Sequence, residues 1–105
     1  MQQNFIQKVS IMKLMKKGRY RFRKKVELII QGLGNKENIK VVTNCFSRLR
    51  VQLVDTTKIN EEILNQTECS GIVKTKDGVQ IIYGLSVPKI KIAVNKKLNL
   101  DNSEE

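Results

Sequence analysis

The fold is decided by residues 39–54, which read IKVVTNCFSRLRVQLV. Polar and apolar residues alternate through residues 48–54, and this period of two is typical of a strand with one buried and one exposed face. Residues 39–42 are mostly β-branched and apolar, so they predict a preceding strand. The polar step Thr43-Asn44 interrupts that pattern and predicts a turn between the two strands.

Cys45 follows this step, which places it at an exposed strand end. Two arginines, Arg48 and Arg50, come next at strand spacing, and they therefore share one face. A thiolate is a nucleophile that neighbouring cations favour, and guanidinium groups bind phosphate oxygens through bidentate, charge-assisted bonds. The three side chains suit a covalently held phosphoryl group, with Cys45 as nucleophile and carrier. A purely structural interpretation stays open, because cysteine is often a buried filler and Arg-x-Arg often a solvated strand face.

The other periodic segments complete one domain. Helical spacing of apolar residues predicts helices within residues 25–34, 58–65 and 86–98, and an Asp-Gly turn between apolar runs predicts a hairpin over residues 71–83. The order is helix, strand, strand, helix, strand, strand, helix. It predicts an α+β fold with a four-stranded, largely antiparallel sheet and about three helices on one face. The arginines are expected on the opposite face.

Positive charge is concentrated at the N-terminus. Residues 1–25 contain nine of the 20 Lys and Arg residues and none of the ten Asp and Glu residues. We therefore expect a basic extension over residues 1–24, a domain over 25–99 and an acidic tail over 100–105. The extension is interpreted as a solvated arm or remnant linker, or as a segment that lies on an anionic membrane surface; nucleic-acid binding is the least favoured alternative. No run approaches the ~20 apolar residues that span a bilayer, and no secretory signal is expected.

Metal and cofactor chemistry is not expected. The sequence has two cysteines and no histidine, so it cannot supply a standard four-ligand zinc site. The second cysteine, Cys69, is interpreted as a small filler, and a Cys45–Cys69 disulfide is not expected in a cytosolic chain.

Several motifs occur in a diagnostic order. Residues 33–39 read LGNKENI, and after a five-residue gap residues 45–51 read CFSRLRV; SGIV at 70–73 and GVQIIYG at 78–84 follow. From residue 26 to about residue 98 the chain resembles the enzyme IIB domain of the bacterial sugar phosphotransferase system, glucose/sucrose superfamily.

The resemblance implies a defined reaction. In that family the cysteine accepts a phosphoryl group from a phosphohistidine of the IIA partner and passes it to a sugar held by the membrane permease IIC. It implies that Cys45 is the phosphocysteine, that Arg48 and Arg50 assist onward transfer, and that the domain works in the cytoplasm at the inner face of the cell membrane. Supporting roles in the phosphate loop are expected for Thr43, Asn44, Phe46 and Ser47. The alternative is a non-catalytic module, either a IIB-like regulatory domain or a basic nucleic-acid binder.

Overall fold

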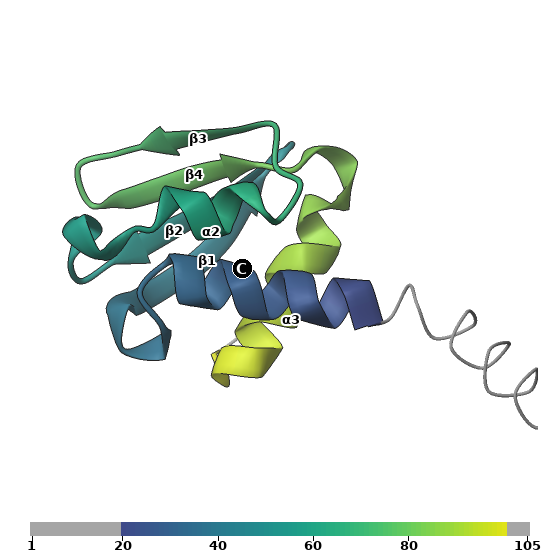
Figure 1. The fold of residues 1–105 in the computed structure, drawn as a ribbon, viewed down its shortest axis with the longest axis horizontal. Coiled ribbons are helices and arrows are strands. Elements are labelled where there is room, and N and C mark those ends of the chain that lie inside the picture. The colour runs from purple at the N-terminus through teal and green to yellow at the C-terminus, as the bar shows by residue number, and fades with distance from the viewer. Residues whose placement is uncertain (1–19, 101–105) are drawn as a thin grey trace, which may run out of the picture.

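The structure, a computed structural model, describes residues 20–100. Its strands form one antiparallel sheet in the order β1-β2-β4-β3 (Figure 1). The strands are β1 (Ile39–Cys45), β2 (Arg48–Leu53), β3 (Gly71–Lys74) and β4 (Gly78–Ile82). The helices are residues 20–32, α2 (Glu61–Asn65) and α3 (Val87–Leu98), with short 3-10 turns η1 (Lys36–Asn38), η2 (Thr56–Lys58) and η3 (Gly84–Ser86). The predicted α+β class, antiparallel sheet and element order are confirmed.

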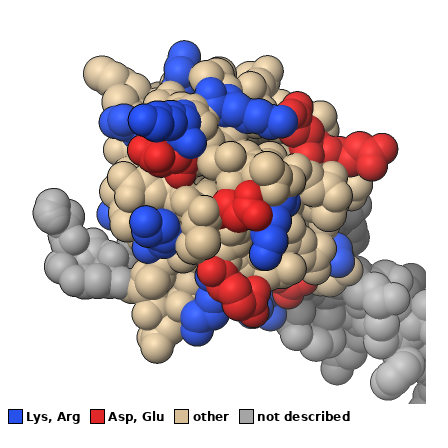
Figure 2. Space-filling model, turned by 90° about the vertical axis from the view of Figure 1, so that its left-hand side faces the viewer, with Lys and Arg blue, Asp and Glu red and all other residues tan. Residues whose placement is uncertain are grey.

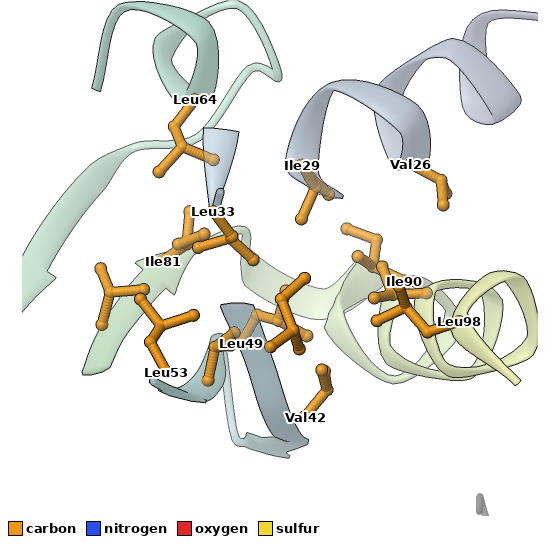
Figure 3. Close-up of a cluster of buried hydrophobic side chains, with 14 of the residues drawn as sticks. Val26, Ile29, Leu33, Val42, Leu49, Leu53, Leu64, Ile81, Ile90 and Leu98 are labelled. Carbon is orange, nitrogen blue, oxygen red and sulfur yellow. The ribbon is translucent and has the colours of Figure 1, made fainter. Parts of the chain in front are cut away.

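One face of the sheet packs against the helices. Burial alternates strictly along β2, where Leu49, Val51 and Leu53 are buried and the intervening residues are exposed. Apolar side chains from the sheet and from all three helices meet in one core (Figure 3). The core members contributed by the helices and by the turn after helix 20–32 are Val26, Ile29, Leu33, Leu64, Val87, Ile90, Val94 and Leu98. The opposite face of the sheet, called the open face below, carries the polar half of the alternation.

The helix of residues 20–32 ends as its sequence indicates. Gly34 has a φ of 94°, and the backbone N–H groups of Gly34 and Asn35 donate to the carbonyls of Gln31 and Ile30. This paired arrangement satisfies the last carbonyls of a helix and favours glycine. At its other end the described helix includes residues 20–24 of the expected basic extension, and Phe22 packs against the core. The rest of that extension, and residues 101–105 of the expected tail, lie outside the described residues.

The position of the first turn corrects the sequence-based prediction. β1 continues through Thr43 and Asn44 to Cys45, and the turn consists of Phe46 and Ser47. A β-bulge lies near Lys40, where Ile39 pairs with Leu53 and Val41 with Gln52, but the register is regular from Val41 to Cys45. The error comes from Asn44, a polar residue that is half-exposed on the helix-covered face near the end of the strand, so two consecutive polar residues did not mark a turn.

The segment before α2 also differs from the prediction of one helix over residues 58–65. Asp55 caps η2, with its side chain accepting the N–H of Thr57, and Asn60 caps α2 by accepting the N–H of Ile63. Two short helical turns therefore replace one helix, because two capping side chains each start a new turn.

A buried asparagine joins two distant loops. Asn38, only 2% exposed, donates through Nδ2 to the carbonyls of Leu33 (2.8 Å) and Asp55 (2.9 Å), and its Oδ1 accepts the N–H of Asp55 (2.8 Å). The end of helix 20–32 is thereby fixed to the segment that follows β2. This contact shows that the NKEN segment before β1 has a structural role.

Candidate functional site

Cys45 lies at the end of β1 with its side chain exposed, and its thiol is free. The register of the β1–β2 hairpin places Cys45 directly opposite Arg48. Directly opposed residues in an antiparallel pair point to the same face, with Cβ atoms about 5 Å apart. The structure therefore excludes the interpretation of Cys45 as a buried filler and places its side chain on the same face as that of Arg48.

The two arginines occupy successive rows of the open face. Arg48 is opposite Cys45 on β1 and Ile82 on β4, and Arg50 is opposite Thr43 and Gln80. Diagonal neighbours in such a sheet are about 7–8 Å apart at Cα, which long side chains can span. Arg50 can therefore reach the same group as Arg48.

The guanidinium of Arg48 has a partner on β4. Its Nη1 donates to Oε1 of Gln80 at 3.0 Å. Gln80 is on the side of β2 away from Cys45, so this contact turns the guanidinium of Arg48 away from β1. An anionic group bound beside Arg48 would offer charge-assisted bonds, which are stronger than a bond to a neutral amide.

The four expected supporting residues divide between the two faces. Thr43 is two positions before Cys45 and shares the open face with it. Asn44 is opposite Leu49, on the helix-covered face, so the structure does not bring its side chain to the face of Cys45. Phe46 and Ser47 form the turn itself, and the side chain of Phe46 is 94% exposed.

Sequence reasoning missed three residues at this end of the sheet. The carbonyl of Ser47 accepts backbone N–H groups from both Tyr83 (2.9 Å) and Gly84 (3.0 Å). Leu85 follows them in η3 and is 96% exposed. Residues 83–85 lie next to the turn Phe46-Ser47 because β4 pairs with β2, which is distant in the sequence. The order of the motifs was the only feature of the sequence that indicated this proximity.

A hollow of about 320 Å³ adjoins Arg50 on the open face. Its lining is largely polar and includes Thr43, Gln52 and Gln80, with the loop between β3 and β4 along one side. The hollow begins at the pair Thr43 and Arg50, which is next to the pair Cys45 and Arg48 on the open face. A group bound at the sulfur would therefore have this space beside it.

The second thiol has a different environment. Cys69 is partly buried against the core, and its Sγ lies 3.6 Å from the carbonyl oxygen of Leu64. Its interpretation as a filler agrees with this packing, and both cysteines are free. Within residues 20–100, no cluster of three or more potential ligands could hold a metal ion, and no helix is long and apolar enough to cross a membrane.

Charges of both signs are mixed on the surface around the β3–β4 loop. The face drawn in Figure 2 shows basic and acidic side chains next to one another rather than a field of one sign. Binding of a nucleic-acid backbone relies on a basic patch or stripe, and this face offers none.

Comparison with known proteins identifies the family of the chain. A family model described as phosphotransferase system, EIIB, matches residues 27–60, which include the buried Asn38, the turn at Cys45 and both arginines. The chain belongs to the EIIB family of the phosphotransferase system. The resemblance inferred from the ordered motifs is thereby confirmed.

Relatives of this EIIB chain extend the match to most of its length. The maltose-specific EIICB component of Bacillus subtilis is 42% identical over 73 residues, which are 69% of this chain and 14% of that protein. The phosphotransferase enzyme IIB component GlvB of Escherichia coli is 31% identical over 78 residues, covering 73% of this chain and 48% of that protein. The chain therefore spans less than half the length of these two relatives.

A solved structure shows the same fold. One domain of the phosphotransferase IIabc component from Clostridium difficile superposes with a TM-score of 0.66 at 27% sequence identity. The superposition covers 81% of this chain and 95% of that domain. The correspondence thus includes nearly all of a solved domain.

Proposed function

We propose that this chain accepts a phosphoryl group on Cys45 from a phosphohistidine of a IIA protein or domain, and passes it to a sugar bound by a IIC permease. The observation that carries the proposal is the exposed thiol of Cys45 directly opposite Arg48 at the end of the sheet. The names of the relatives, EIICB components, support a IIC partner. Such a partner places the domain, proposed as residues 25–99, at the inner face of the cell membrane.

The chemistry consists of two displacements at phosphorus. In the first, the Cys45 thiolate attacks, the S–P bond forms, the P–N bond breaks, and its electron pair returns to the imidazole of the donor. In the second, a sugar hydroxyl attacks, the S–P bond breaks to regenerate the thiolate, and the hydroxyl proton leaves to a base on the acceptor side. The chain contains no histidine, so the donor belongs to another domain or polypeptide.

The arginines supply electrostatic stabilisation to the second displacement. Arg48→Gln and Arg50→Gln are each expected to slow transfer from Cys45 to the sugar by about 100-fold, because each removes a cation from the developing charge. The measurement is the loss of label from pre-phosphorylated protein after addition of membranes that contain a IIC permease, with maltose, the sugar in the name of the Bacillus subtilis relative, as the acceptor. Arg23→Gln, on helix 20–32 and away from the open face, is the matched control. Equal rates for Arg50→Gln and the control would contradict the role of Arg50.

Two exposed apolar side chains beside the thiol provide a docking surface for the donor. Phe46 and Leu85 are both more than nine-tenths exposed, and the hydrogen bond from Gly84 to the Ser47 carbonyl holds their backbones together. We expect a protein that reaches the sulfur of Cys45 to contact both side chains. Buried apolar anchors at the centre of an interface contribute a large share of its affinity.

The double variant Phe46→Ser/Leu85→Ser is therefore expected to raise the KM for the phosphorylated IIA donor by at least about tenfold. The maximal rate and the free energy of unfolding should stay unchanged, because neither side chain is in the core. Val54→Ser is the matched control, since Val54 is 68% exposed at the opposite end of β2. A KM equal to that of the control would remove these residues from the docking surface.

The direct test of the proposal maps the phosphorylated atom. The protein is incubated with phosphorylated IIA, digested, and the modified peptide is identified by mass spectrometry. The expected adduct is on Cys45 and is acid-stable and cleaved by iodine, as a thiophosphate ester should be. Ser47 is a hydroxyl competitor two positions away, and Cys69 is a second thiol in the same chain. An adduct on either of these would show that the acceptor is not Cys45. No adduct, together with retention on DNA, would favour a non-catalytic module.

A further inference from the structure

The turn after Cys45 has an unusual backbone for its length. Two residues, Phe46 and Ser47, join β1 to β2. Two-residue hairpins favour turns with at least one left-handed residue, because that backbone matches the twist of the strands. Neither Phe46 nor Ser47 has a positive φ. Its conformation is therefore not the one that the hairpin alone would favour.

The segment after β4 supplies the missing constraint. The N–H of Tyr83 continues the β2–β4 ladder to the Ser47 carbonyl, and the N–H of Gly84 adds a second bond to the same oxygen. Gly84 reaches it with a φ of 83°, a conformation that glycine adopts without steric cost. With two donors, the Ser47 carbonyl oxygen has both lone pairs occupied. Its partial negative charge is therefore not directed at an incoming phosphate dianion, which it would repel.

The side chain of Tyr83 is anchored far from the thiol. Its hydroxyl lies 2.6 Å from Oγ1 of Thr67, which is 1% exposed. Oγ1 of Thr67 donates its one proton to the carbonyl of Leu64, so the Tyr83 hydroxyl is the donor to Thr67. Burial raises the pKa of Tyr83, which keeps that donor protonated. The ammonium of Lys25 lies over the ring at 5.1 Å from its centroid.

We propose that Tyr83 and Gly84 are positioning residues for phosphoryl transfer at Cys45. They hold the Ser47 carbonyl, and so fix the turn that sets Cys45 opposite Arg48. Through Thr67 and Lys25 the turn is connected to the end of α2 and to helix 20–32. The inference rests on the proposed function, because it assigns these residues to the same transfer step.

The sharpest test uses the backbone at Gly84. A Cβ there would meet no atom within 4 Å, so Gly84→Ala changes the preferred φ without a steric clash. We expect the maximal rate of phosphoryl uptake to fall at least about fivefold. Gly84→Asn should recover most of the rate, because asparagine tolerates the left-handed region. Tyr83→Phe, which removes only the distant hydroxyl, should give a smaller loss of the maximal rate.

An independent measurement separates this inference from the proposed function. Amide hydrogen exchange of residues 83 and 84 should be at least about tenfold faster in Gly84→Ala than in the wild type, whether or not Cys45 is phosphorylated. Unchanged exchange, or a wild-type maximal rate in Gly84→Ala, would overturn the inference, as would a Gly84→Asn variant as slow as Gly84→Ala. Failure of the wild type itself to take up label would instead overturn the proposed function. The exchange result would then decide whether Tyr83 and Gly84 hold the Ser47 carbonyl.

Discussion

Replacement of Cys45 by serine is expected to abolish phosphoryl acceptance, with a loss of at least about 1,000-fold in rate. A serine hydroxyl is not ionised at neutral pH and needs an adjacent base to act as a nucleophile. The chain has no histidine to serve as that base. The measurement is the rate of label transfer from phosphorylated IIA, with the folded state of the variant checked by its free energy of unfolding. Because Cys45 is exposed, the fold should be unaffected.

The second cysteine provides an internal control for this experiment. Cys69→Ser should accept the phosphoryl group at the wild-type rate, because Cys69 packs against the core and is not on the open face. If label persisted in Cys45→Ser and disappeared in Cys69→Ser, the site would have been assigned to the wrong thiol. If both single variants retained label, a hydroxyl or a carboxylate would be the acceptor.

Replacement of Asn38 by leucine should give the largest loss of stability, about 3 kcal/mol, measured by urea unfolding. The leucine fits a similar volume but leaves the carbonyls of Leu33 and Asp55 and the N–H of Asp55 without the partner that they now have. A buried polar group left unpaired costs its full desolvation free energy. The midpoint of unfolding should fall while its denaturant dependence stays constant.

Asn65→Leu is the matched control for that prediction. Asn65 is exposed at the end of α2, and substitutions at such positions change stability by about 0.5 kcal/mol or less. A loss at Asn38 no larger than that of the control would show that the hydrogen bonds between the two loops do not hold them together.

Local patterns predicted the elements of the fold well. The alternation of β2, the apolar stripes of helix 20–32 and α3, and the Asp-Gly turn between β3 and β4 each depend on neighbours within a few residues. The face of Asn44 depends instead on the pairing of β1 with β2, and for this reason the turn was predicted three residues too early. The predicted helix over residues 58–65 is divided into η2 and α2 because Asp55 and Asn60 each cap a separate turn. The sequence alone does not indicate which of the two capping residues starts the helix.

The candidate site was predicted in the same uneven way. Strand periodicity was sufficient to place Arg48 and Arg50 on one face, and the strand end was sufficient to expose Cys45. The residues contributed by β4 and by the segment after it, namely Gln80, Tyr83, Gly84 and Leu85, required the pairing of segments more than 30 positions apart along the chain. A pattern read in a short window carries no information on such pairings, and it likewise misplaced Asn44, whose face is set by its register with Leu49.

The edge strand β1 has a further consequence for self-association. Unpaired backbone groups along an edge can template pairing with another chain and lead to aggregation. In the middle of β1 the carbonyl of Val42 already accepts a hydrogen bond from Nδ2 of Asn95 on α3, at 3.2 Å, and the bulge near Lys40 distorts the strand at its start. A second copy could not add a regular strand there without displacing that asparagine. The sheet can therefore present its thiol to other proteins while resisting edge-to-edge polymerisation along this side.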